Sequence, residues 1–510
     1  MTFETTMSVA VQTQPLLATY ADDDDYHDND DDNDEGKKNN AYIELQSLAT
    51  DDEVDVTNDD CQRTRTLPST ARSRIYAILG FLHGMLPTFF KKGGLRHYHP
   101  TPKSPTAYLD GLRGWMALIV AFYHSGKADD RPWLQYPVIH FLDAGRSAVV
   151  VFFVISGYVL SYHVLKLARK QEPAAVLDSL ASAVFKRWLR LYIPTGMASL
   201  VVAIALHVGF LSNPPTPNIF LELVRWFKDF VRSSNPFVNL VGYWYGDIFR
   251  TVYLDQMWTI PLEFRGSMII LGYCTATIKL RPAARIMLTT SLILSTYIYQ
   301  AVWIGTFLAG MLAADISLSW RPEDHFPSPP TLPVVDCEKR PTAAAKGYTL
   351  YLHATYVTLA SLAVFLLSMP DVLGRDGEAK IWTILASVVP SWEGGREYFY
   401  LCPASMLLVL VLDLYAPLRS LMLTPYSQYL GTHSFGIYAM HNTIIWGVEL
   451  RWLRPYCRDV LGNSLWSAVL SLIPLLLLIF WCAECFTRFD RLSVRTAGRL
   501  QAKLFTAWQT

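Results

Sequence analysis

The stretch Tyr108-Leu-Asp-Gly-Leu-Arg-Gly-Trp-Met-Ala-Leu-Ile-Val-Ala-Phe-Tyr-His124 has the pattern of one apolar helix that carries two ionisable side chains. Arg113 and His124 lie eleven positions apart, which at about 100° per residue amounts to three turns plus about 20°. Both side chains are therefore expected on one helix face, about 16 Å apart along the axis. Ionisable side chains inside a membrane helix are costly and usually serve a pathway or a reaction. The stretch thus predicts a membrane helix with a fixed cation near one end and, near the other, an imidazole that exchanges protons close to neutral pH.

Apolar runs recur along all but the first part of the chain. Of the 510 residues, 51% are hydrophobic, and the runs approach the roughly 20 residues with which a helix crosses a bilayer. Ten runs are found, at 112–126, 147–165, 192–211, 258–278, 284–299, 301–316, 347–368, 398–415, 430–450 and 464–486. This pattern predicts an all-α fold, a polytopic transmembrane helical bundle of about ten spans in a lipid bilayer.

The formal net charge of zero conceals two oppositely charged parts. Residues 1–60 hold 18 acidic residues and two lysines, which leaves 42 basic and 26 acidic residues in the rest of the chain. The acidic part has too few apolar residues to build a core, so residues 1–70 are predicted to be a disordered acidic cytosolic tail. This tail is either merely solvated or binds a protein partner. We expect no nucleic-acid partner.

Further segments flank the predicted membrane domain, which comprises residues 105–486. The run Ile75–Phe90 is short and precedes two lysines, so residues 71–104 are predicted to form an interfacial amphipathic segment. Residues 487–510 carry several arginines and a lysine and are predicted to be a basic cytosolic tail.

Basic residues predict the orientation, because they are enriched in cytosolic loops. The loops after the second and fourth runs and the tail after the tenth are basic, and Arg169 and Arg285 are among their charges. These three segments lie on one side of a ten-span bundle, whereas Arg451, Arg454 and Arg458 fall on the other. The majority predicts an integral multi-pass protein with both termini in the cytosol, in an endomembrane or the plasma membrane.

The seven cysteines are scattered along the chain. Cys482-Ala-Glu-Cys485 has C-x-x-C spacing without a second pair, which is a weak metal signal, so packing cysteines are the favoured interpretation. We therefore predict neither a metal site nor a bound cofactor.

A basic cluster precedes the third run. Arg187 and Arg190 are three positions apart and are therefore neighbours on a helix face. Guanidinium groups bind phosphate through paired hydrogen bonds, so a phosphate-rich donor that approaches from the cytosol would meet them. The pair also fits the ordinary enrichment of basic residues in cytosolic loops.

Polar residues in three more runs are candidates for a site. Ser156 precedes a glycine, and small residues of this kind allow the close approach of either another helix or a ligand. Glu263 stands in the first turn of a predicted helix, where it either complements the helix dipole or orients a histidine or a substrate hydroxyl. Ser434, Tyr438 and His441 share one helix face, which either lines a substrate cavity or joins two helices.

These segments resemble, in this order, the motifs of the acyltransferase 3 family of integral membrane acyltransferases. Arg113 and His124, with ten residues between them, match the family's signature Leu-Asp-Gly-Leu-Arg-Gly followed by a histidine. Four further segments are similar to its Phe-Phe-x-x-Ser-Gly, Arg-x-x-Arg, Trp-Ser-Leu-x-x-Glu and Ser-Tyr-x-x-Tyr-x-x-His motifs, namely Phe152–Gly157, Lys186–Leu191, Trp258–Glu263 and Ser434–His441. The resemblance covers residues 105–485, and five motifs in this order are specific.

The chain departs from the family pattern at two motifs. Thr259 and Ile260 replace Ser-Leu and are soon followed by Arg265, and Phe435 replaces a tyrosine. This form resembles fungal members of the family, so the polysaccharide acceptors of bacterial members are not implied.

The resemblance implies transfer of an acyl group, often acetyl, from the co-substrate acyl-coenzyme A (acyl-CoA) to a hydroxyl of a lipid, metabolite or glycan. An alcohol is a poor nucleophile and needs a base, which we expect to be His124. Arg113 would bind the donor's phosphates or stabilise the oxyanion, and Glu263 would orient His124 or the acceptor. Arg187 and Arg190 would hold the phosphates of coenzyme A. The substrate cavity is expected beside the three polar residues Ser156, Tyr438 and His441.

Two other functions fit the same features. A transporter or flippase would use Arg113 and His124 as a binding or proton-relay pair, and it would consume no acyl-CoA. A membrane scaffold would recruit partners through its acidic tail. Deletion of residues 1–60 would abolish the function of a scaffold, whereas His124→Ala would leave it intact.

Overall fold

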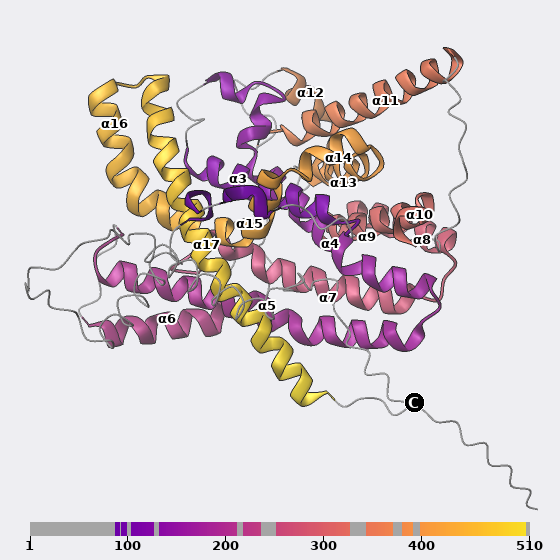
Figure 1. Ribbon diagram of the computed structural model, residues 1–510, viewed down its shortest axis with the longest axis horizontal. Helices are drawn as coiled ribbons and strands as arrows, with labels where there is room; N and C mark the ends of the chain where they lie inside the picture. Colours follow the sequence, from indigo (N-terminus) through magenta and orange to yellow (C-terminus); the bar gives the residue numbers. More distant parts are fainter. Residues whose placement is uncertain are drawn as a thin grey trace, which may run out of the picture. The chain divides into compact units, whose positions relative to one another are not determined.

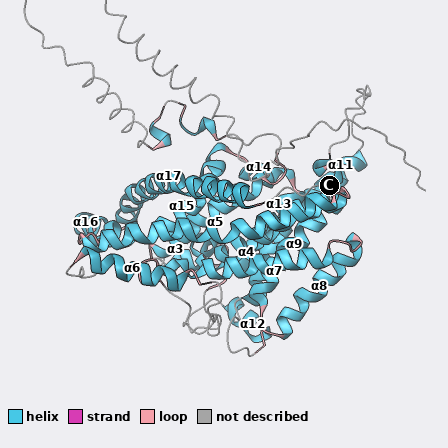
Figure 2. Cartoon of the chain, turned by 90° about the horizontal axis from the view of Figure 1, so that it is seen from below, coloured by secondary structure: helices cyan, strands magenta, loops and turns pink. Residues whose placement is uncertain are grey.

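The computed structural model describes residues 87–91, 93–98, 104–126, 132–211, 218–235, 251–326, 343–370, 380–390 and 398–505. Within these ranges the regular structure is helical and includes no strand (Figure 1, Figure 2), so the predicted all-α fold is confirmed. The acidic tail lies outside the described residues. Of the run Ile75–Phe90, only the last residues lie within them, in the 3-10 turn η1 (Thr88–Phe90).

Each of the ten apolar runs lies mainly within one helix. These helices are α3 (Ala107–His124), α4 (Gly145–Arg169), α5 (Pro173–His207), α7 (Thr259–Thr277), α8 (Pro282–Ile298), α9 (Val302–Trp320), α11 (Ala343–Leu367), α13 (Tyr398–Leu414), α15 (Pro425–Ile444) and α17 (Leu465–Leu504). Shorter elements connect them, namely η2 (Gly94–His97), η3 (Pro132–Gln135), η4 (Ile139–Asp143), α6 (Ile219–Ser233), η5 (Asp255–Trp258), α10 (Pro322–His325), α12 (Lys380–Val388), α14 (Ala416–Met422), the π-helix η6 (Ile445–Leu453) and α16 (Arg454–Leu461).

Fewer of these helices have the length and hydropathy of a membrane span. Among the described residues five do, namely α4, α5, α9, α17 and the part Leu350–Leu367 of α11. The pair α13 and α14, bent by 101°, makes a sixth candidate. The number of ten spans therefore stays a prediction. Charged or polar side chains lower the hydropathy of α3, α7 and α15, and these include the candidate site residues.

Prolines and capping side chains explain where several helices begin. Pro173, Pro282 and Pro425 stand in the first turn of α5, α8 and α15, where the missing N–H would have no helical partner. The hydroxyl of Thr424 accepts a hydrogen bond from the N–H of Ser427 at 3.3 Å, which caps α15.

Glycines allow the closest helix crossings. A Cβ on Gly114 of α3 would lie 2.4 Å from the backbone N of Gly431 in α15, and one on Gly431 would lie 2.5 Å from the carbonyl O of Asp110. A Cβ on Gly310 of α9 would lie 2.0 Å from the carbonyl O of Val154 in α4. Residues without a side chain let backbones approach this closely. The α3–α15 crossing sets the register of the two helices that carry most of the candidate site.

Arg169 and Arg285, which the orientation prediction treats as loop charges, are held between helices. Arg285 is 1% exposed, and its Nε and Nη2 donate to the two carboxylate oxygens of Asp315 at 2.7 and 2.8 Å. Arg169 donates to the carbonyl O of Asp315 at 2.9 Å. Arg454, whose charge falls on the opposite side of the predicted bundle, pairs with Glu449 of the adjoining η6 at 3.2 Å and donates to the carbonyl O of Ser125 at the end of α3. These arginines join helices to one another and therefore carry little weight for the orientation.

The helix α6 packs its acidic side against the segment that precedes α7. Glu222 accepts a hydrogen bond from the Tyr253 hydroxyl at 2.7 Å, and Asp229 accepts one from the N–H of Val252 at 3.3 Å. Burial raises the pKa of the Asp229 carboxyl above its ordinary value. The opposite side of α6 is apolar and exposed, with Phe227 58% exposed. These contacts hold α6 beside η5 and the start of α7.

Candidate active site

Arg113 and His124 of α3 both lie against α15. The Nε of Arg113 donates to the hydroxyl of Ser434 at 2.9 Å, and the centroid of the His124 ring lies 5.1 Å from that of His441. The earlier residue of α3, Arg113, meets the earlier residue of α15, Ser434, and the later residue His124 meets the later residue His441. The two helices therefore run in the same direction. The structure therefore brings together the two sets of residues that the sequence singled out on separate helix faces.

The histidine end of this helix pair combines an exposed and a buried imidazole. His124 is exposed and His441 is fully buried, and their rings are inclined by 37°. The Nδ1 of His441 lies 3.2 Å from the carbonyl O of Ile437, whereas its Nε2 has no hydrogen-bond partner among the described residues. Buried polar atoms are nearly always hydrogen-bonded. The ring that carries this unbonded nitrogen lies beside the exposed ring of His124.

A hydrogen-bond network joins the histidine end to the start of α7. The hydroxyl of Tyr438 lies 2.7 Å from that of Thr259 and donates to the carbonyl O of Gln256. The side chain of Gln256 donates to the carbonyl O of Ala439 at 2.9 Å and accepts from Asn442 at 3.0 Å. Through these bonds, η5 holds the stretch of α15 that ends in the buried histidine.

Glu263 is part of a charged cluster at the other end of the site. Its carboxylate pairs with Arg187 of α5 and accepts a hydrogen bond from Ser156 of α4. Arg187 also donates to the hydroxyls of Ser267 at 2.8 Å and Ser156 at 3.2 Å. The cluster therefore ties α4, α5 and α7 together. The contacts of Glu263 are with Arg187 and Ser156, rather than with His124.

Arg113 and Arg190 belong to the same charged end. Asp490 of α17 lies close enough to both for their charges to interact, and Glu263 interacts with Arg113 in the same way. The side chain of Arg113 is 42% exposed and pairs with Asp110 at 3.0 Å. Three arginines from α3 and α5 thus gather at this end together with the acids Asp110, Glu263 and Asp490, and we call it the charged end.

Sequence reasoning missed several residues that complete the site. Gln256 and Asn442 link η5 to α15, and Asp490 adds an acid to the charged end. Asn442 directly follows His441, and Gln256 stands two positions before Trp258. Polar residues beside recognised motifs were the available signal.

Metal-ligating side chains do not gather at either end. Across the described residues there is no group of three or more His, Cys, Asp or Glu side chains placed to hold a metal ion. The thiols of Cys482 and Cys485 are free.

Comparison with known proteins supports a single family. A family model described as an acyltransferase domain, that of acyltransferase 3, matches residues 106–485. This range includes all five motifs and both ends of the site. No solved structure matches the chain.

Curated fungal proteins are similar to the chain over most of their length. O-acetyltransferase PaAT-1 of Phomopsis amygdali is 28% identical over 416 residues, which are 74% of this chain and 79% of that protein. Acyltransferase R4 of a Phoma species is 23% identical, over 68% of this chain and 84% of that protein. Acyltransferase clz18 of Cochliobolus lunatus is 21% identical, with the same two shares.

Proposed function

The chain belongs to the acyltransferase 3 family and is an O-acyltransferase, and on that premise we propose that it moves an acyl group from acyl-CoA to a hydroxyl, with His124 as the base. The acceptor is a lipid, metabolite or glycan hydroxyl. The observation that carries the proposal is the contact between the exposed ring of His124 and the buried ring of His441. His124 makes this contact at one end of α3, and Arg113 lies towards the other end of the same helix.

The reaction needs two proton transfers, one from the acceptor hydroxyl to the base and one from the base to the leaving thiolate. The acceptor oxygen attacks the thioester carbonyl carbon, the C–O bond forms, and the C–S bond breaks. His124 takes the hydroxyl proton and returns it to the departing thiolate, so the products are an ester and free coenzyme A. A positioned general base contributes about 10²–10⁴-fold to such a rate. The exposed His124 is accessible to substrate, and the buried His441 supports its ring.

The charged end binds the phosphates of coenzyme A. Arg113 has a half-exposed side chain, and both Arg113 and Arg190 lie close enough to Asp490 for their charges to interact. Arg187 is already shared between Glu263 and two serine hydroxyls. Its charge therefore contributes to the field at this end, while Arg113 and Arg190 contact the phosphates. Glu263 acts on the donor side by holding Arg187 in place.

The protein is an integral membrane protein whose charged end faces the cytosol, where coenzyme A is found. The C-terminal part of α17, which begins near Asp490, lies at this end. Thr88 also lies beside α17, because its N–H and hydroxyl donate to Glu484 at 2.9 Å each. Thr88 and the C-terminal part of α17 are therefore neighbours, which supports the prediction that both termini are cytosolic.

The test compares wild type and His124→Ala, each purified in detergent and incubated with labelled acetyl-CoA and membrane lipid extract. Wild type is expected to transfer the label and release coenzyme A, and the variant to be slower by about 10²-fold or more. A variant that folds normally and keeps full activity would falsify the role of His124. Wild type that consumes no acetyl-CoA under any acceptor mixture would favour a transporter instead.

A further inference from the structure

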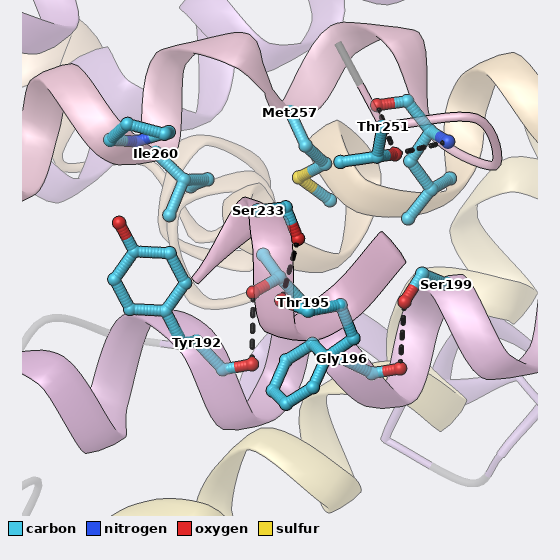
Figure 3. A pocket seen from close by; sticks show the side chains of 11 residues that line it. Tyr192, Thr195, Gly196, Ser199, Ser233, Thr251, Met257 and Ile260 are labelled. Carbon is cyan, nitrogen blue, oxygen red and sulfur yellow. Dashed lines mark hydrogen bonds between the residues drawn. The ribbon is translucent and has the colours of Figure 1, made fainter. Parts of the chain in front are cut away.

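A small cavity lies between α5, α6 and the segment 251–261 (Figure 3). None of the eleven residues that line it carries an acidic, basic or imidazole side chain. Met257 lines the cavity, and the neighbouring Gln256 donates to the carbonyl O of Ala439 in α15. The segment η5 therefore stands between this cavity and the stretch of α15 that leads to His441. The groups that organise the histidine end belong to other elements.

A π-helix continues α15 directly beyond the buried histidine. The helix α15 ends at Ile444, and η6 follows without a break from Ile445 to Leu453. Stretches of π-helix are rare and are frequently found at functional sites. Here the π-helix begins four residues after His441, so it extends the helix that carries this histidine.

The π-helical geometry pairs a buried acid with the first residue of α16. The side chain of Glu449 in η6 is 0% exposed, and its Oε1 lies 3.2 Å from the Nη2 of Arg454. In an α-helix, residues five positions apart point about 140° away from each other. The i→i+5 hydrogen bonds of a π-helix place them on nearly the same face, and the N–H of Arg454 donates such a bond to the carbonyl O of Glu449. The π-helix therefore brings the guanidinium to the buried carboxylate.

Arg454 also holds the end of the helix that carries His124. Its Nη2 donates to the carbonyl O of Ser125, the residue that follows His124 and caps α3. The last carbonyls of an α-helix have no partner within the helix, and the helix dipole favours a cation at this end. Ser125 is buried, so this bond forms inside the protein. Arg454 thus connects the end of α3 to the carboxylate of Glu449.

Two contacts therefore act on His124, one from α15 and one from its continuation. The ring of His441 lies 5.1 Å from the His124 ring, measured between centroids. Arg454 binds the backbone one residue further along. The His124 side chain is exposed, so the protein does not enclose its ring, and the position of the backbone decides where the ring can reach.

We propose that Glu449 and Arg454 are positioning residues that fix the end of α3 and thereby place the His124 ring for the reaction. The proposal rests on the proposed function, because it assumes that His124 is the base. Neither residue contacts the substrate. Arg454 acts through the carbonyl of Ser125, and Glu449 acts by holding the guanidinium of Arg454.

Arg451 of the same π-helix provides a matched control. Its Nη1 donates to the carbonyl O of Gly209 at 3.0 Å and to that of Phe210 at 3.1 Å, just beyond the end of α5. Arg451 therefore holds a helix end as Arg454 does, but that helix carries neither His124 nor His441. The control separates the loss of a helix-end contact in general from the loss of the contact to α3.

The experiment measures kcat and the KM for acetyl-CoA of purified variants by label transfer. Arg454→Ala is expected to lower kcat by about tenfold to a hundredfold, the cost of misplacing a reacting group by about 1 Å. The KM is expected to stay unchanged, because the charged end is intact. Arg454→Lys keeps a cation that can donate to Ser125 and is expected to restore part of the rate. Arg451→Ala is expected to keep the kcat of wild type.

Coupling to His124 distinguishes a positioning role from a structural one. If Arg454 acts through His124, Arg454→Ala lowers the rate of wild type but not the residual rate of His124→Ala, because the base that Arg454 positions is absent. Two independent losses would instead multiply. An equal factor in both backgrounds would overturn the proposal, and so would an Arg454→Ala protein with the kcat of wild type.

A second variant covers the case in which Arg454→Ala does not fold. Breaking a buried ion pair by removing one partner is destabilising. If Arg454→Ala is not monodisperse, Arg454→Met combined with Glu449→Gln removes both charges and is expected to lower kcat in the same way; an unchanged kcat there is equally contrary. A His124→Ala protein with full activity would overturn the proposed function and this proposal with it. A slow His124→Ala protein without coupling to Arg454 would overturn this proposal alone.

Discussion

Two imidazoles in ring contact, one exposed and one buried, form the centre of the proposed reaction site. Sequence spacing placed His124 on the face of Arg113, and His441 on the face of Ser434 and Tyr438, and it could go no further. Which face meets which depends on the backbone approach at Gly114 and Gly431, a contact between residues more than 300 positions apart. For the same reason, the bond between Arg113 and Ser434 could not be predicted from either helix alone.

His441 is expected to act as a positioning residue for His124. Replacing His441 with alanine removes the ring that contacts the His124 ring. A reacting group that is misplaced by about 1 Å can lower the rate about a hundredfold. We therefore expect His441→Ala to lower kcat by about tenfold to a hundredfold, with the KM for acetyl-CoA unchanged, because the charged end is intact. Label transfer from acetyl-CoA at varied donor concentration measures both parameters.

His433 provides the control on the same helix. It is buried, and its Nδ1 and Nε2 lie 2.9 Å from the Thr487 hydroxyl and 3.0 Å from the Tyr98 hydroxyl. His433→Ala is expected to lower the Tm and leave kcat nearly unchanged. Equal losses of kcat in the two variants would mean that His441 has only a structural role.

At the scale of helices, periodicity predicted where helices occur better than where they end. The run 464–486 is the first part of α17, which has 40 residues and continues through most of the basic tail. The run 192–211 is the second part of α5, which has 35 residues and begins at Pro173. Hydropathy identifies the apolar part of a helix, whereas the polar extension is stabilised by packing, such as the bond between Ser182 and Gln501 that joins α5 to α17 at 3.1 Å.

The α3–α15 crossing is expected to tolerate no side chain at Gly114. Its Cβ would lie 2.4 Å from the backbone of Leu430 and Gly431, and backbone cannot move aside as a side chain can. Overpacking of this kind typically costs about 1–3 kcal/mol. We expect Gly114→Ala to lower the Tm in detergent and also the rate of acyl transfer, because Arg113 and His124 depend on the same register.

Gly272→Ala is the matched control for this substitution. Gly272 is exposed in α7, and a Cβ there would meet nothing within 4 Å. Alanine favours a helix over glycine by about 1 kcal/mol, so the Tm should stay the same or rise. A Gly114→Ala protein as stable as this control would contradict the close backbone approach of α3 and α15.

At the scale of the whole molecule, the sequence predicted an all-helical fold, but not which charged side chains pack between helices and which lie at the surface. Arg169 and Arg285 are indistinguishable from loop arginines in the sequence, yet both bind Asp315. Glu263 has two partners that lie 76 and 107 positions away. Whether a charged side chain of a membrane protein packs between helices or lies in a surface loop depends on its partner. The tertiary fold determines which partner that is.

The orientation of the protein in the membrane also depends on such partners. Contacts between residues are therefore better support for it than counts of basic residues in loops. Thr88 and Glu484 are bonded, and Asp490 lies near Arg113 and Arg190, so Thr88 and the C-terminal part of α17 both lie beside the charged end. If that end binds coenzyme A, a tag before the domain and a tag after α17 must both face the cytosol. We expect protease added outside sealed microsomes to remove both tags without detergent, while a luminal marker stays intact. Protection of the C-terminal tag alone would require an odd number of spans and would place α17 in the opposite direction.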